Sequence, residues 1–499
     1  MVYVHHSLCL CRYLFPVASI VVRSVLLLIM FYALRVSLSK HRNYSDVLAV
    51  IIVVISLTEA LLGIYQVVTG NSRNSHFPMT GTFLNPGPYG TLLACGLIIL
   101  LTLRKKYWTV IKLHGNTSLL KYAIFFAASL MAFMLLMTMS RAAILAFSVC
   151  LFGMYRDRIK IRILPICIIL ITALAFYLIK QDSANSRFII WRVSLCSISM
   201  NAIAGTGPGS FLHQYADGMA MLSSAMPDGY FNTTDVVLYA FNFLLLIGVE
   251  QGFIGLSFAA IIIFIIGLRM YSSNNVMKWI LPLLFLTSLF SYTIELLPFQ
   301  VLIVIASASL FSDENKCNAS FRINPFPALL LCLFVSVCVM PIVNDRVEAN
   351  NSYKKIRGIL TSEYINEYRL LYPYMNDNPI FLYDFARVLS NGRRFIDSNA
   401  ILRDGMLVSA DPMFLIQQAN NYRDIGEYDM AEEYYYRAFA VMPNRLYPLY
   451  RLMQLYAGQP ERQSDAQSMA RRIIAFPVKI ASPATNLMKS EANRLVIIH

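Results

Sequence analysis

Long apolar runs separated by short polar segments fill the first two thirds of the chain. Nine runs reach or approach the length of a membrane span, at residues 14–34, 47–68, 88–103, 119–138, 141–155, 163–179, 250–268, 279–297 and 326–344. Because a spanning helix needs about 20 mainly apolar residues, the runs predict a polytopic membrane helix bundle of about 9–11 spans. We interpret the first as a membrane segment and not as a removable signal peptide. Residues 299–311 are shorter and predict a tight pair with their neighbour or a re-entrant segment.

The pattern changes after Pro341, where charged and aromatic residues alternate with aliphatic ones. Small and aromatic residues have the spacing of a tetratricopeptide repeat (TPR) at Leu415, Ala419, Tyr422, Gly426, Ala431, Tyr435, Ala438 and Pro443. We therefore predict an all-α protein with a membrane domain over residues 1–344, including a large loop at 180–236, and a soluble TPR-like helical solenoid over 345–499. A helical cap that packs on the membrane domain is the alternative.

Composition agrees with the apolar pattern. Charged residues are 14% of the 499 and hydrophobic residues 57%, whereas a soluble domain carries about 25% charged residues, so a single soluble domain is excluded. The net charge of +14 could favour nucleic acid. Most of the excess precedes residue 345 and lies in the short loops between apolar runs, so we predict no nucleic-acid partner.

Basic residues divide the loops into two sets. One set holds Arg35, Lys40, Arg42, Arg104, Lys105, Lys106, Lys112, Lys121, Arg156, Arg158, Lys160, Arg162, Arg269, Lys278, Lys316 and Arg322, and the opposite set holds Arg73, Arg141, Lys180, Arg187 and Arg192. The positive-inside rule assigns the richer set to the cytoplasm. The loop at 180–236 and the region after residue 344 are then expected on the outer face.

The nine cysteines give no sign of a metal or disulfide framework. Most of them lie inside the apolar runs, and no close pair has histidine nearby. We interpret them as small apolar residues and predict neither a metal nor a cofactor.

Polar residues on the expected outer face are the candidates for chemistry. Thr82 and Asn85 precede an apolar run and can cap its helix, while Arg141 lies between two runs, where an arginine is costly unless it is functional or reaches the lipid headgroups. Arg187 and Arg192 are five residues apart and so about 140° apart on a helix. They need not face one ligand.

Two further segments carry candidate groups. The turn at 205–211, with Gly207 and Gly209, could present backbone N–H groups to a phosphate, but such runs are also common turn material; His213 and Tyr215 follow it. Asn242 and Glu250 share one face of the next apolar helix. They could line a cavity, or be a cap and an interfacial glutamate.

The order of these motifs resembles the O-antigen ligase/polymerase (Wzy_C) superfamily over residues 45–310. The motifs are Gly81-Thr-Phe-x-Asn-Pro86, Ser140-Arg141, Arg187 with Trp191, Gly205-x-Gly-Pro-Gly-x-Phe211 with Tyr215, and Ala240-x-Asn242 with Glu250-x-Gly252-x-x-Gly255. The resemblance implies a glycosyltransferase of the bacterial inner membrane that takes a glycan from an undecaprenyl diphosphate carrier. The resemblance implies that the acceptor of the glycan is a lipid, a growing polysaccharide or a protein.

The resemblance also implies roles for particular residues. Arg187 corresponds to the arginine thought to hold the diphosphate, with Arg192 and Arg141 as supporting candidates, and Thr82, Asn85, Gly207, Gly209, Tyr215 and Asn242 as candidate substrate-binding residues. The family histidine thought to activate the acceptor is Phe241 here, and a phenyl ring cannot accept a proton. Replacement bases on this face are His213, Glu250, His76 and Asp235.

Two other functions stay open from the sequence. Phe241 permits a catalytically degenerate, membrane-anchored TPR scaffold for envelope glycan assembly. A transporter is less favoured, because no internal repeat is evident in the membrane half. The TPR-like region shows no catalytic constellation, and we expect it to recruit a partner of the cell envelope.

Overall fold

The computed structural model describes residues 2–41, 43–113, 118–158, 167, 178, 181–226, 230–232, 234–312, 325–478 and 481–497. Within these ranges the chain forms helices joined by turns, and no strand occurs. The predicted all-α class is therefore confirmed. The run at 163–179 lies almost entirely outside the described residues.

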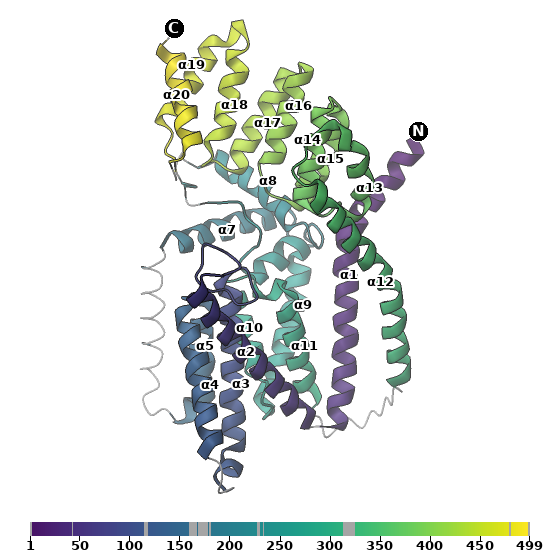
Figure 1. Cartoon of the computed structure of the whole chain (residues 1–499), viewed down its shortest axis with the longest axis vertical. Coiled ribbons are helices and arrows are strands. Elements are labelled where there is room, and N and C mark those ends of the chain that lie inside the picture. Colours follow the sequence, from purple (N-terminus) through teal and green to yellow (C-terminus); the bar gives the residue numbers. More distant parts are fainter. Residues whose placement is uncertain are drawn as a thin grey trace.

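Five of the described helices are long and apolar enough to cross a membrane. They are residues Ile20–Lys40 of α1 (Val2–Lys40), α2 (Asn43–Thr69), residues Pro86–Tyr107 of α3 (Pro86–Leu113), residues Leu119–Met137 of α4 (Ser118–Met137), and α9 (Phe243–Ser272). Two shorter apolar helices, α5 (Arg141–Tyr155) and α11 (Leu297–Ser312), lie among them (Figure 1). A membrane protein with several apolar helices is thus what the structure shows.

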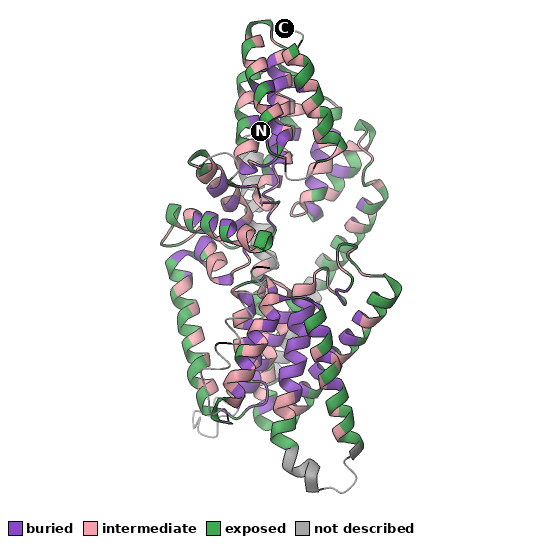
Figure 2. Cartoon of the chain, turned by 90° about the vertical axis from the view of Figure 1, so that its left-hand side faces the viewer, coloured by how far each residue is buried: buried purple, intermediate pink, exposed green. Residues whose placement is uncertain are grey.

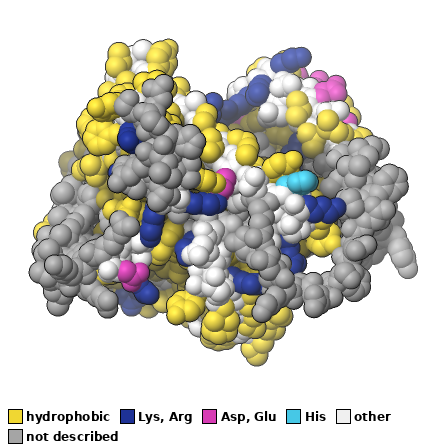
Figure 3. Space-filling model, turned by 90° about the horizontal axis from the view of Figure 1, so that it is seen from below, with side chains coloured by type: hydrophobic (Ala, Val, Ile, Leu, Met, Phe, Trp, Pro, Cys, Tyr) yellow, Lys and Arg dark blue, Asp and Glu magenta, His cyan; other side chains and the backbone are white. Residues whose placement is uncertain are grey.

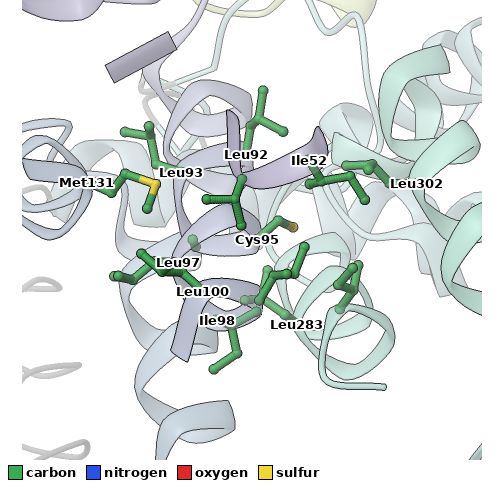
Figure 4. Packing of buried hydrophobic residues seen from close by; sticks show 14 of the residues in the cluster. Ile52, Leu92, Leu93, Cys95, Leu97, Ile98, Leu100, Met131, Leu283 and Leu302 are labelled. Atoms are coloured by element: carbon green, nitrogen blue, oxygen red, sulfur yellow. The ribbon is translucent and has the colours of Figure 1, made fainter. Parts of the chain in front are cut away.

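Helix α3 is the centre of this bundle. Within its spanning window 72% is buried, against 6% for α9 and 0% for α1, and Figure 2 shows the same contrast between the interior and the outer helices. Leu93, Ile98 and Met131 are among the fully buried side chains of the core (Figure 4). Helix α2 comes close to α3 at Gly96, where an added Cβ would lie 2.2 Å from the Ser56 side chain. Small residues allow such close packing.

The predicted span at 279–297 is wrong, because these residues do not form one helix. Helix α10 covers only Ile280–Ser288, a turn with the 3₁₀ helix η2 (Thr293–Glu295) follows, and α11 begins at Leu297. Ser291, Tyr292 and Thr293 interrupt the apolar run, and Pro298 fits the first turn of α11, where a missing N–H costs nothing. Residues 299–311 therefore form a tight pair with their neighbour, which was one of the two expectations.

The large loop and the C-terminal region lie at the same end of the bundle, which we call the loop end (Figure 1). The loop contains α7 (Gln181–Met200), the glycine turn at residues 205–210 and α8 (Phe211–Ser224), and an irregular segment at 234–240 leads from it to α9. At the opposite end, basic side chains outnumber acidic ones on the exposed face (Figure 3). The η1 turn (Arg156–Arg158) follows α5 there.

The C-terminal region is a row of short helices in which neighbours in sequence pack together. It follows α12 (Pro325–Ile356) and comprises η3 (Ser362–Tyr364), α13 (Ile365–Met375), α14 (Pro379–Asn391), α15 (Phe395–Val408), α16 (Met413–Ile425), α17 (Tyr428–Val441), α18 (Leu446–Ala457), η4 (Pro460–Arg462), α19 (Gln463–Ala475) and α20 (Pro483–Ile497). Gly426 ends α16 in a left-handed conformation with φ 92°. The predicted boundary at residue 344 lies inside α12, and the assignment of the helices to TPRs stays a prediction.

Candidate functional site

A small cavity at the loop end brings together three of the predicted site residues. It has a volume of about 150 Å³, and its lining includes Asn85, Arg141 and Arg187. The other lining residues are Phe77, Pro86, Gly87, Thr138, Met139, Ser140, Ala142, Ser183, Phe241, Ser291 and Tyr292. We call it the arginine cavity. Because ligand pockets commonly measure about 300–1,000 Å³, it fits a small group and not a whole oligosaccharide.

Arg187 enters the cavity from α7. Its guanidinium carbon lies 5.3 Å from the centre of the Phe241 ring, within the range of a cation–π contact. Burial, followed by the nearby charge of Arg141, lowers the pKa of Arg187 to about 10. The side chain therefore remains a cation at neutral pH, but burial leaves it only partly hydrated.

Arg141 enters from the first residue of α5. Its Nη2 donates a hydrogen bond to the Ser183 hydroxyl at 3.0 Å, which ties α5 to α7. The first residues of α3 and α5 line the same cavity, and helix N-termini favour anions through their free N–H groups. Among the residues that the structure describes, no carboxylate lines the cavity. The charge distribution therefore suits an anion.

Backbone strain gathers at this cavity. Met139 and Phe241 have φ angles of 50° and 52°, in the left-handed region that is unfavourable for residues with bulky side chains. Both line the cavity. Such conformations cost of order 1–3 kcal/mol each and tend to occur at functional sites. The strain is an observation independent of the charge, and it points to the same place.

Tyr292 is a lining residue that the sequence reasoning missed. Its ring stacks on Tyr239 with centroids 4.0 Å apart and an angle of 6° between the planes, and it meets the edge of Phe241 at 5.5 Å. Burial raises the pKa of Tyr292 to about 12, so its hydroxyl is a neutral hydrogen-bond donor. Its place in the apolar run at 279–297 concealed it. Three consecutive polar residues, Ser291, Tyr292 and Thr293, interrupt that run and were the sequence signal that could have revealed the turn.

Thr82 and Asn85 have different surroundings although they are close in sequence. The N–H and hydroxyl of Thr82 donate to the two carboxylate oxygens of the buried Glu59 at 3.0 and 2.6 Å. The carboxylate thereby anchors the loop to α2. Asn85 lines the arginine cavity and accepts a bond from the N–H of Gly87 at 2.9 Å. Of the two, only Asn85 belongs to the cavity.

Asn242 and Glu250 are engaged in backbone structure. The Asn242 side chain caps α9 by accepting from the N–H groups of Leu244 and Leu245. The Glu250 carboxylate lies near the backbone N–H groups of Gly209 and Phe211. The glycine turn that could offer N–H groups to a phosphate thus faces a glutamate of this chain. Neither residue lines the arginine cavity.

A break in α9 makes room for that glycine turn. Gly252 has φ 61° and ψ −157° inside the helix, and the freed N–H groups of Phe253 and Ile254 donate to the carbonyls of Ala202 and Ile203 at 2.8 and 3.2 Å. In return, the N–H of Gly207 donates to the Glu250 carbonyl at 2.8 Å. The turn is therefore bonded directly to the first part of α9.

The remaining candidates lie away from the arginine cavity. Arg192 donates to the Tyr230 hydroxyl at 2.8 Å, so the two arginines of α7 have different partners, as their spacing allowed. His213 lies 3.6 Å from Asp217, and Gly207 and Gly209 line a second cavity with it. Tyr215 is buried, and its hydroxyl has no partner among the described residues.

The other two replacement bases are also placed elsewhere. Asp235 pairs with Arg445 of the C-terminal region at 3.0 Å. His76 is exposed, and its backbone N–H donates to the Asn74 side-chain oxygen at 3.1 Å. Neither lines the arginine cavity, although Phe77, next to His76, does. Among the described residues, no group of three or more histidine, cysteine, aspartate or glutamate side chains could hold a metal ion.

Comparison with known proteins identifies one similarity. Residues 126–260 match the family model Wzy_C, described as O-antigen ligase. No curated protein and no solved structure matches the chain. The matched segment includes Arg141, Arg187 and Phe241, but it excludes Asn85 and Tyr292, which complete the cavity from outside it. The segment that supplies both arginines of the cavity is therefore similar to the O-antigen ligase family, and this supports a glycan ligase-type or polymerase-type function.

Proposed function

We propose that the chain transfers or polymerises a glycan from an undecaprenyl diphosphate carrier at the periplasmic face of the bacterial inner membrane. The arginine cavity carries the proposal, because two guanidinium groups and two helix N-termini meet there and its described lining contains no carboxylate. A diphosphate is the anionic part of such a carrier. The position of the cavity at one end of the apolar helices is where a lipid-linked headgroup would be met.

The reaction requires stabilisation of a leaving group. The bond between the anomeric carbon and the diphosphate oxygen breaks, and a bond from that carbon to an acceptor oxygen forms. Negative charge then develops on the diphosphate. Arg187 and Arg141 would hold it through charge-assisted hydrogen bonds, which guanidinium forks form with two oxygens at once. Tyr292 would add a neutral donor. The proposal invokes no cofactor.

The acceptor hydroxyl must also lose its proton. None of His213, Glu250, His76 and Asp235 lines the cavity, and Phe241 occupies the position of the family histidine. We infer that the departing diphosphate oxygen takes this proton. A general base contributes about 10²–10⁴-fold to a rate, so the reaction would be slower than with a base but still catalysed by charge stabilisation.

The C-terminal helices would recruit a partner. We propose that they form a TPR-like periplasmic domain for a lipid, polysaccharide or protein of the cell envelope. A catalytically degenerate scaffold is the second candidate, and Phe241 is the observation that favours it. The two candidates differ in whether the arginine cavity is needed for transfer.

Glycan transfer in cells tests the proposal. Arg187→Ala is expected to lower transfer by about 10²–10³-fold, the cost of removing one donor from a charge-stabilising site, with protein abundance unchanged. Arg192→Ala, five residues along the same helix but outside the cavity, is the matched control and should retain most of the transfer. Lipopolysaccharide, capsule and glycoprotein patterns would name the acceptor. Normal transfer by Arg187→Ala would favour the scaffold.

A further inference from the structure

A second and larger cleft lies between the loop and the C-terminal helices. It consists of two adjoining cavities of about 400 and 410 Å³, which share His213, Asp404 and Leu407. The glycine turn and α8 form one wall. Side chains of α13, α15 and α17 form the other, including Tyr372, Asp404 and Arg437. We call it the α8 cleft.

Direct bonds hold the two walls together. Arg437 pairs with Asp217 of α8 at 2.9 Å, and the hydroxyl of Ser223 donates to the Ala440 carbonyl at 2.8 Å. Asn444 donates to the carbonyl of Thr234 at 2.6 Å. These contacts lie at the α17 end of the cleft. The cleft is therefore a built feature of a specific interface between the loop and the C-terminal helices.

Charges nearly cancel in the α8 cleft, unlike in the arginine cavity. Asp217 has both Arg437 and His213 as neighbours, and Asp411 accepts from the N–H of Met413 at 2.9 Å. Asp404 accepts a bond from the Tyr372 hydroxyl at 2.7 Å. Neutral polar groups supply much of the remaining lining of one cavity, from Asn201, Thr206, Ser210, Gln214 and Asn376. Apolar side chains such as Met406, Leu415 and Val441 line much of the other. A neutral ligand that has both hydroxyl groups and apolar faces matches this mixture.

The cleft is elongated along α8. One cavity extends from the glycine turn to Gln214, and the other includes His213, Ala216 and Asp217 on one face of the helix. Its first end is bonded to α9 through Gly207, next to the membrane bundle. Its second end reaches Val441 in the C-terminal region. Such a path suits a polymer that is held at the membrane and extends away from it.

We propose that the α8 cleft binds a neutral saccharide segment of the glycan chain. The proposal rests on the proposed function, because the glycan is the ligand that this function brings to the loop end. Tyr372 and Tyr434 offer aromatic surface for the apolar faces of sugar rings, and Asp404 offers an acceptor for their hydroxyls. A folded protein acceptor would not need an elongated cleft that begins beside the membrane bundle.

Photo-cross-linking in cells tests the cleft directly. The full-length protein carries the photoreactive residue p-benzoylphenylalanine in place of Leu407, which borders both cavities. The matched control carries it at Ile425, which is 47% exposed and outside the cleft. We expect a cross-linked band that stains for periodate-oxidised sugar from position 407 alone. A cross-link to protein only, no cross-link, or equal sugar staining from both positions would overturn the proposal.

A substitution in the cleft provides the second arm. Asp404→Asn is combined with the photoreactive residue at position 407. The substitution keeps the shape of the side chain but removes its charge. We expect about a 5-fold lower yield of the sugar cross-link, the effect of roughly 1 kcal/mol of hydrogen bonding. Asp424→Asn is the control, because Asp424 pairs with its neighbour Arg423 outside the cleft. An unchanged yield in Asp404→Asn would contradict the assignment of this carboxylate.

The outcomes separate the two proposals. Sugar cross-linking at position 407 together with normal transfer by Arg187→Ala would retain the cleft and reject the transferase. Loss of transfer in Arg187→Ala without sugar cross-linking at position 407 would retain the transferase and reject the cleft.

Discussion

The arginine cavity and the α8 cleft both receive residues from the large loop but differ in charge, size and strain. The cavity is small, cationic and lined by two residues with left-handed backbone conformations. Each of the two cavities of the cleft is more than twice as large, and the cleft is nearly neutral and lined by both apolar and hydrogen-bonding side chains. The difference teaches that one loop can contribute to an anion-attracting cavity and to a nearly neutral cleft at separate places, as the two proposed ligands would require.

Gly252 breaks α9 where the chain that leads into the glycine turn packs against it, so its substitution should have the largest effect. A Cβ there would lie 2.4 Å from the Ile203 carbonyl oxygen, and the φ and ψ angles are essentially restricted to glycine, at a cost of about 1–3 kcal/mol or more for other residues. Gly252→Ala should sharply reduce the amount of folded protein, measured by size-exclusion chromatography in detergent. Gly267→Ala in the same helix is the control, because nothing lies within 4 Å. Equal yields of both variants would contradict the described break.

Tyr292 tests whether a neutral donor assists the cavity. Tyr292→Phe should lower glycan transfer by about 10-fold, because it removes one hydrogen bond to a charged ligand worth about 1.5 kcal/mol. Tyr239→Phe keeps the stacked ring and alters a residue outside the lining, so it should have little effect. If the two variants behave alike, the Tyr292 hydroxyl has no special part in transfer.

The sequence predicted the two arginines of the cavity but not the side of the cavity that Tyr292 forms. Arg141, Arg187 and Asn85 could be singled out because polar groups beside apolar runs are conspicuous. Tyr292 could not, since hydropathy averaged over 279–297 hides a turn between two short helices. The roles of Asn242 and Glu250 were equally beyond reach, because a cap and a carboxylate that faces a glycine turn depend on backbone geometry. The helical class and the long apolar helices follow from composition and periodicity alone.

Glu295, in the same turn as Tyr292, should make stability depend on pH. Burial, followed by the charge of Glu250, raises the pKa of Glu295 to about 8, whereas an unfolded glutamate titrates near 4.3. The protonated carboxyl therefore stabilises the fold, an effect that is complete below about pH 4 and lost as the pH rises through about 8. The Tm of Glu295→Gln minus that of the parent protein should therefore increase as the pH rises from 5 to 8. A constant difference across this range would contradict the shift.

Arg437 should give the smallest effect of the set. Its ion pair with Asp217 is partly exposed, and such pairs contribute about 0–1 kcal/mol. Arg437→Ala should therefore change Tm only slightly and leave the rate of transfer nearly unchanged, while altering the length distribution of the glycan product on gels. A large loss of transfer would mean that the cleft and the cavity do not act separately.

The central claim is that the cavity, and not the cleft, binds the diphosphate. Thermal unfolding of the purified protein with increasing inorganic diphosphate measures this directly, because a ligand of the folded state raises Tm with its concentration. The parent protein and Arg437→Ala should show the same rise in Tm, and Arg187→Ala should show none. An equal rise in Arg187→Ala, or its loss in Arg437→Ala, would contradict the account.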